Sequence, residues 1–230
     1  MRLLGFLHGV LLTMVLTLRP RPSAPRLILA MLLASLTAYL GIRQFDAARG
    51  TAASALIIGL RYALPFLVGP FLHFYIAAAT GRWLRLSRSS LLHLAPFLLT
   101  LSIAPCVSIA PENVTPFEFV HAIHGLGYTV SAARAVHGYA SRVACLQAQK
   151  ETRVRVLWLW SLVVCIGVTT LAAVCCHALG DPSFVSQFRI ALVIHWIGTA
   201  LFLFPTILDD SARHPRLSFR WRKASKPTVH

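Results

Sequence analysis

Apolar runs long enough to cross a membrane alternate with short polar segments along the chain, as far as about residue 205. A helix that spans the hydrocarbon core of a bilayer needs about 20 mostly apolar residues. We expect seven spanning helices, at about residues 3–18, 27–42, 53–79, 91–109, 116–139, 154–177 and 184–204. The pattern therefore predicts an all-α, polytopic membrane bundle over residues 1–205, followed by a tail at 206–230.

The third run contains two prolines, Pro65 and Pro70, with Gly69 beside the second. A proline inside a helix leaves a backbone carbonyl without its usual donor, and in a bilayer that carbonyl needs a partner from another helix. We therefore predict that this helix is kinked and lies in the interior of the bundle.

Composition supports a membrane protein over a soluble one. Apolar residues make up 57% of the 230 residues and charged residues only 13%, about half the charged fraction of a typical soluble domain. The net charge of +15 suggests a nucleic-acid-binding protein at first. The charges, however, lie in short blocks between apolar runs rather than on one amphipathic face.

The basic blocks predict the orientation of the bundle. Most of the 22 Lys and Arg lie after the first run, after the third, around the end of the fifth, and in the tail. Short cytoplasmic loops accumulate Lys and Arg, so we expect the N-terminus outside and the tail inside. We also expect the tail to contact anionic lipid headgroups, through Arg216, Arg220, Arg222, Lys223 and Lys226.

The first run could also be a signal peptide. The segment that follows it, RPRPSAPR, contains Arg19, Arg21 and Arg26 and no small-residue cleavage pattern. An uncleaved first span is the interpretation that we prefer.

Two stretches resemble a known family. GPFLHFYIAAATGR, at residues 69–82, and LLHLAPFLL, at residues 91–99, are similar to the third and fourth spans of membrane-anchored regulators of the AraC type. VHGYASRV, RVLWLWSLVV and ALVIHWIGTALFLF are looser matches to that family's last three spans. The resemblance implies a sensory or regulatory module in the bacterial inner membrane, which signals to a cytoplasmic partner or acts as a homodimer.

The family's helix-turn-helix output domain has no counterpart in the tail. Residues 206–230 show no amphipathic period of a recognition helix. We therefore expect no sequence-specific DNA binding by this chain. Either a partner protein supplies the output domain, or the gene is truncated.

A polar stripe on the fifth run is the main candidate for a ligand site. Glu118, His121 and His124 recur at helical spacing and share one face. Arg61 and Arg189 are predicted near the same, outer, end of the membrane. A charge within a membrane marks function by default. If Glu118 pairs with Arg189 or Arg61, these five residues form an outward-facing polar pocket for a ligand. The alternative is that the charged side chains lie near helix ends and extend to the interface.

Imidazoles and thiolates also suggest a metal, with zinc or copper as the candidates. His121, His124, His177 and Cys175 are predicted at one depth. The competing interpretation is that these histidines hydrogen-bond across helices or extend to the interface. No cofactor is our main expectation.

Other histidines are predicted at other depths. His73, His93 and His137 fall near the inner face and His195 near the middle. Haem b, held by His73 and His137, is an alternative at the inner face. Retinal is excluded because no Lys lies within a span.

Cys106, Cys175 and Cys176 end helices at the predicted outer face. Packing as small apolar residues is the role that we expect for them. A disulfide formed in an oxidising periplasm is the alternative.

A sensory module is the function that we expect, with a small transporter or a metal- or haem-binding membrane protein as alternatives. Two matching halves with broken helices, which are typical of transporters, are missing from the sequence. No nucleophile, base and orienting acid share one depth, so we do not expect an enzyme.

Overall fold

A computed structural model describes residues 2–18, 23–49, 55–81, 90, 92–104, 114–144, 150–178 and 183–203. Over these residues the regular structure consists of eight helices and no strand, which confirms the predicted all-α class for that part of the chain. The helices are α1 (Arg2–Thr17), α2 (Ala24–Arg49), α3 (Ala55–Ala63), α4 (Pro65–Ala79), α6 (Ala95–Ile103), α7 (Val114–Arg142), α8 (Lys150–Ala178) and α9 (Ser183–Leu203).

The third apolar run forms two helices rather than one. α3 and α4 are separated by Leu64 and meet at an angle of 44°. Pro65 is the first residue of α4, a position where a missing backbone N–H costs nothing. The chain continues as helix through Pro70, so the bend of this run lies at Pro65.

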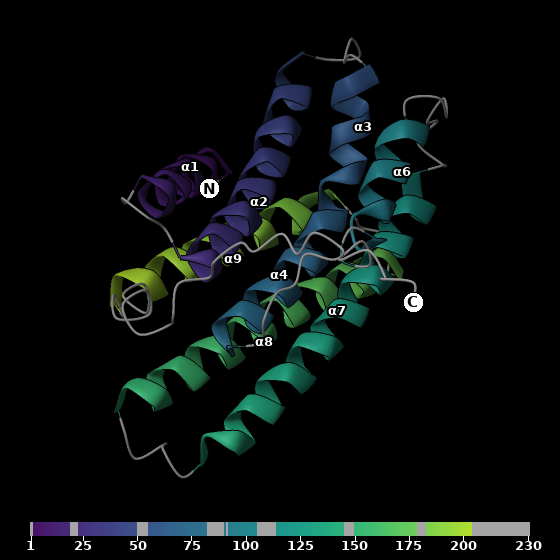
Figure 1. Ribbon diagram of the computed structural model, residues 1–230. Coiled ribbons are helices and arrows are strands. Elements are labelled where there is room, and N and C mark those ends of the chain that lie inside the picture. Colours follow the sequence, from purple (N-terminus) through teal and green to yellow (C-terminus); the bar gives the residue numbers. More distant parts are fainter. Residues whose placement is uncertain are drawn as a thin grey trace, which may run out of the picture.

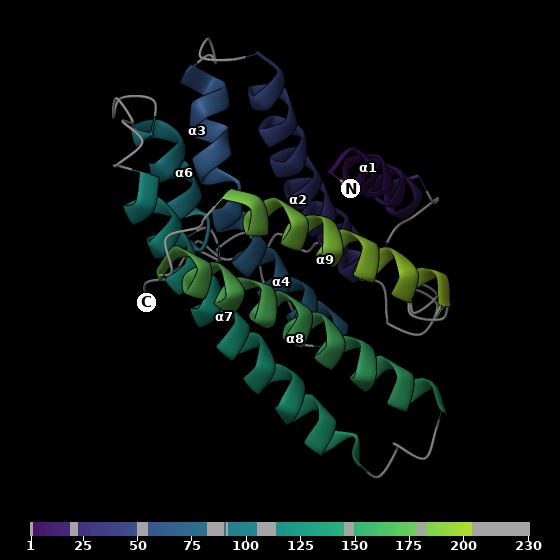
Figure 2. The same ribbon diagram turned by 180° about the vertical axis from the view of Figure 1, so that it is seen from behind.

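α4 occupies the middle of the bundle, between α2 and α7 (Figure 1). α8 packs antiparallel to α7, and α9 crosses the opposite side of the molecule, where it contacts α8, α2 and α1 (Figure 2). α3 packs against α6. The N-terminal helix α1 contacts both α2 and α9, and is thus part of the bundle.

Several helices contribute fully buried side chains to one core. Leu33 of α2, Leu72 of α4, Leu159 of α8 and Ile194 of α9 are fully buried. Near them, the indole Nε1 of Trp158 donates a hydrogen bond to the Tyr75 hydroxyl at 2.7 Å. This bond joins α8 to the central helix α4.

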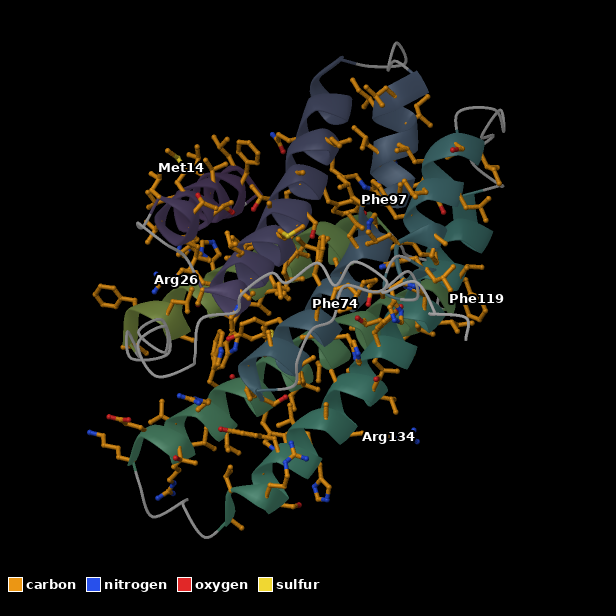
Figure 3. All side chains as sticks on the ribbon, viewed as in Figure 1. Met14, Arg26, Phe74, Phe97, Phe119 and Arg134 are labelled. Atoms are coloured by element: carbon orange, nitrogen blue, oxygen red, sulfur yellow. The ribbon has the colours of Figure 1, made fainter. Side chains whose placement is uncertain are left out.

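The outside of the bundle is apolar. Large apolar side chains such as Leu11, Leu99, Leu171 and Phe202 are exposed over half or more of their surface. Figure 3 shows Met14 and Phe119 extending away from their helices. Exposed apolar surface on this scale is expected of a bundle that faces lipid tails rather than water.

Length and composition single out the helices that could cross a membrane. Within the described residues, Ala24–Gln44 of α2 and Lys150–Cys175 of α8 are long and apolar enough. Leu56–Ala63 and Pro65–Ala79 form a third crossing if the bent pair counts as one span. Two or three such helices support a membrane protein, and the seven-span arrangement stays a prediction.

Candidate functional site

A cavity of about 100 Å³ lies where six helices, α2, α3, α4, α7, α8 and α9, meet. It is lined by the C-terminal parts of α2, α3 and α8 and by the N-terminal parts of α4, α7 and α9. Apolar residues such as Val68 and Ile166 form much of its wall. The cavity is smaller than the pockets that take drug-sized ligands, which occupy about 300–1,000 Å³.

Two arginines give this cavity its charge. Arg43 of α2 and Arg61 of α3 line it, and none of the described residues in the wall is acidic. The Arg43 Nε donates to the Tyr39 hydroxyl at 3.1 Å, and the guanidinium carbon lies 5.5 Å from the centre of the same ring. The Arg61 guanidinium lies at the same distance, 5.5 Å, from the Tyr62 ring. Aromatic faces thus hold both guanidinium groups in place at the wall.

The cavity brings together two of the five residues of the predicted pocket, Arg61 and His121. His124 lies one helical turn further along α7. The rings of His121 and His124 both contact the ring of Phe66 on α4. The side chains of Glu118 and Arg189 lie outside the described part of the structure. Arg43 and Tyr39, which were not predicted as site residues from the sequence, also contribute polar groups to the wall.

Next to the cavity, three histidines gather around Tyr128 of α7. The Tyr128 hydroxyl hydrogen-bonds Nδ1 of His93 at 2.5 Å. The ring of His124 packs against the Tyr128 ring with centroids 4.8 Å apart, and His73 of α4 lies 6.0 Å away. Histidines that were expected at different depths therefore meet at one tyrosine. The packing of α4 on α7 and the position of His93 just before α6 bring them together.

A glycine on α4 makes room for this tyrosine. A Cβ atom at Gly69 would lie 2.7 Å from Cδ2 of Tyr128 and 3.0 Å from its Cβ, closer than carbon atoms pack. Gly69, which was predicted as part of a kink, is therefore the point where the backbone of α4 approaches Tyr128.

The metal and haem alternatives gain no support from the geometry. Over the described ranges, no three His, Cys, Asp or Glu side chains lie close enough to hold one ion. Cys175 is exposed with a free thiol, and the side chain of His177 is outside the described residues. His137 is exposed on α7, whereas His73 contacts His93 and Tyr128.

Two further histidines join α1 to α9. Nδ1 of His8 on α1 and Nδ1 of His195 on α9 are 2.6 Å apart, so one proton lies between the two imidazoles. Gly198 lies beside His8, where a side chain would overlap the imidazole. His195 was predicted near the middle of the membrane, and the partner on α1 was not identified.

Part of this arrangement was accessible from sequence. The stripe that holds His121 and His124 continues along α7 to Tyr128 and Ser131, at helical spacing. Arg43 lies one turn after Tyr39 on the same face of α2, a spacing at which guanidinium and phenol meet. The partner side chains His73 and His93 needed the packing of α4 and α6 on α7.

The resemblance to AraC-type regulators rests on two stretches that the structure brings together, since α4 and α6, which hold most of their described residues, are in contact. This proximity is a property of the fold and identifies no family. Comparisons of the chain with models of protein families, with characterised proteins and with solved structures found no match.

Proposed function

We propose that this chain is a sensory module of the bacterial inner membrane that binds a small anion in the cavity and signals to a cytoplasmic partner or to a second copy. The proposal takes the seven-span topology, with the N-terminus outside and the tail in the cytoplasm, from the distribution of basic residues. The cavity would then open toward the periplasm.

One observation carries the proposal. Two guanidinium groups line a small and mostly apolar cavity whose described wall has no negative charge. Arginine is costly within a membrane and marks a functional site there by default. A guanidinium binds a carboxylate through two parallel hydrogen bonds, and this geometry adds specificity to the charge. A short-chain carboxylate fits both the charge and the apolar part of the wall.

Butyrate is a suitable probe. We expect it to raise the melting temperature of the detergent-solubilised protein, because a ligand that binds only the folded state stabilises it. Butyramide, which has nearly the same shape and no charge, should have no effect at the same concentration. Equal stabilisation by the two compounds would mean that the arginines do not select for charge.

Removing either arginine tests the site directly. Arg61→Gln and Arg43→Gln should each weaken butyrate binding at least about tenfold, the loss expected for a hydrogen bond to a charged group. Arg134→Gln is the control, because Arg134 is exposed on α7 and extends away from the bundle (Figure 3). Isothermal titration calorimetry gives the three affinities. Unchanged affinity in Arg61→Gln would exclude this cavity as the anion site.

The topology has its own test. Alkaline phosphatase fused after His230 should be inactive, and green fluorescent protein at the same place should be fluorescent, because the tail is proposed to be cytoplasmic. A phosphatase fusion in the segment between α8 and α9, around residue 180, should be active. A phosphatase active at His230 would reverse the proposed orientation and would place the cavity on the cytoplasmic side. The tail and its basic residues lie outside the described residues, so their contact with anionic headgroups stays part of this proposal.

A further inference from the structure

A row of polar side chains leaves the cavity along one stripe of α7. His121, His124, Tyr128 and Ser131 follow one another at intervals of three or four residues, so they point to the same side of the helix. From the first to the last, the row covers about 15 Å at 1.5 Å per residue. That length is about half of the hydrocarbon core of a bilayer.

Contacts join the members of this row to each other and to α4. The rings of His121 and His124 both pack on Phe66, and the His124 ring packs on Tyr128. Tyr128 hydrogen-bonds His93 at 2.5 Å, and the ring of His93 is 6.1 Å from that of His73.

The far end of the row lies on α4. The hydroxyl of Ser131 and Nδ1 of His73 are 3.2 Å apart. Six residues, or about 9 Å of helix, separate His73 from Ala79 at the end of α4. The row thus extends from the cavity toward the opposite end of the bundle.

Packing alone does not explain these residues. Apolar side chains at the same positions would fill the space between α4 and α7 without burying polar groups, which is costly in a membrane. Both ring nitrogens of His124 are buried and have no hydrogen-bond partner among the described residues. The ring of Tyr128 packs so closely on α4 that only a glycine fits at position 69. The arrangement favours a role that uses the polar atoms.

We propose that this row conducts protons between the cavity and the half of the bundle in which α4 ends. Imidazole can accept a proton on one ring nitrogen and release another from the second, and a phenol can pass a proton through its oxygen. The hydroxyl of Tyr128 donates its proton to Nδ1 of His93 while its oxygen receives one from His124. One bridging water, or a turn of the His124 ring, completes that link.

Each transfer moves one proton and leaves no residue changed once the rings reset. No oxidant, reductant or other reactant is needed. The other titratable groups of the described surroundings include Arg43, Arg61, Tyr39 and Tyr62 at the cavity. His73 of α4 belongs to the row. The two arginines keep their charge throughout, and each packs against one of the two phenol rings. The inference requires that the chain spans the membrane, but it does not require that the cavity binds an anion.

Proton flux into liposomes tests the row. The purified full-length protein is reconstituted into vesicles that contain KCl and the pH-sensitive dye pyranine, and valinomycin then imposes a potassium diffusion potential. We expect the wild-type vesicles to acidify faster than protein-free vesicles. Tyr128→Phe should reduce the rate to that of protein-free vesicles, because it removes one hydroxyl and leaves the ring in place.

A second variant keeps the test valid if Tyr128→Phe fails to fold. His93→Gln retains a hydrogen-bonding side chain but cannot exchange a proton on two nitrogens, and it should lose the flux as well. His137→Gln is the matched control, since His137 is exposed on α7, the helix that carries Tyr128. The flux of this variant should equal that of the wild type.

Three outcomes would overturn the proposal. They are a wild-type rate no higher than that of protein-free vesicles, a folded Tyr128→Phe or His93→Gln variant with the wild-type rate, and an equal loss in His137→Gln. Circular dichroism and gel filtration in detergent establish the folded state of each variant. Failure of butyrate to bind, with the proton flux intact, would count against the proposed sensory function alone.

Discussion

Gly69→Ala is expected to lower the free energy of unfolding by about 1–3 kcal/mol, the usual cost of adding a methyl group to a filled core. The new Cβ would lie 2.7 Å from Cδ2 and 3.0 Å from Cγ of Tyr128. That ring is not free to move aside, because its hydroxyl bonds His93 and its face contacts His124. Unfolding in SDS, followed by circular dichroism, gives the change in free energy.

Gly127→Ala is the matched control for this variant. Both are single methyl additions to a helical glycine, but outside the adjacent residues and the local helix backbone no described atom lies within 4 Å of the position that a Cβ at Gly127 would take. Alanine is the better helix former, so the control should be neutral or more stable by up to about 1 kcal/mol. Equal losses in the two variants would place the effect in the helix backbone and would exclude the contact with Tyr128.

The same substitution also connects stability with the proposed proton row. Displacing the Tyr128 ring moves its hydroxyl away from His93, so the Gly69→Ala protein should conduct fewer protons at a temperature where it is still folded. A variant that is destabilised but conducts normally would separate the packing of Tyr128 from its proposed transfer role.

Helix positions were the most predictable part of this protein, since they depend on local apolar runs. The runs at 27–42 and 154–177 correspond to α2 and α8, which are also the helices long and apolar enough to cross a membrane within the described residues. Pro65, Gly69 and Pro70 predicted a kink in the third run because a proline affects its own helix. The structure bends by 44° at Pro65, and the helix continues through Gly69 and Pro70.

Contacts between helices were harder to predict. His93 and Tyr128 are 35 residues apart and His8 and His195 are 187 residues apart. No periodicity within one helix indicates which faces of two helices will meet. Assigning each histidine a depth in the membrane therefore predicted neither the His93–Tyr128 contact nor the His8–His195 contact. Of the residues that line the cavity, only Arg61 and His121 were predicted as site residues. Arg43, which also lines it, lies on another helix, α2.

One packing signal was present in the sequence. Gly5 and Gly9 are four residues apart on α1, and small residues at this spacing let two membrane helices approach closely. A Cβ at Gly5 would lie 2.9 Å from the Cβ of Ala191 on α9, and one at Gly9 would overlap the Thr37 hydroxyl on α2. The two glycines therefore face the two helices that α1 contacts.

Gly9→Ala should destabilise the protein by about 1–3 kcal/mol through this overlap, and Thr37→Ala should recover part of the loss. Thr37 is buried, and its hydroxyl has no hydrogen-bond partner among the described residues, so its removal costs little by itself. The recovery should be partial, because the Cβ of Thr37 would still lie 3.1 Å from the new methyl group.

A double-mutant cycle measures this coupling. We expect the two changes together to cost less than the sum of the single changes, with an interaction energy of about 0.5–3 kcal/mol. Gly138→Ala combined with Thr37→Ala is the control pair, because the nearest atom to a Cβ at Gly138 is Nη1 of Arg142, at 3.8 Å. That pair should be additive within about 0.5 kcal/mol.

The cycle also distinguishes an uncleaved first span from a signal peptide. If the helix that carries Gly9 were removed from the mature protein, Gly9→Ala would leave its stability unchanged and Thr37→Ala would have the same effect in both backgrounds. A coupled response requires that α1 stays in the bundle and packs against α2, next to the His8–His195 pair that joins it to α9.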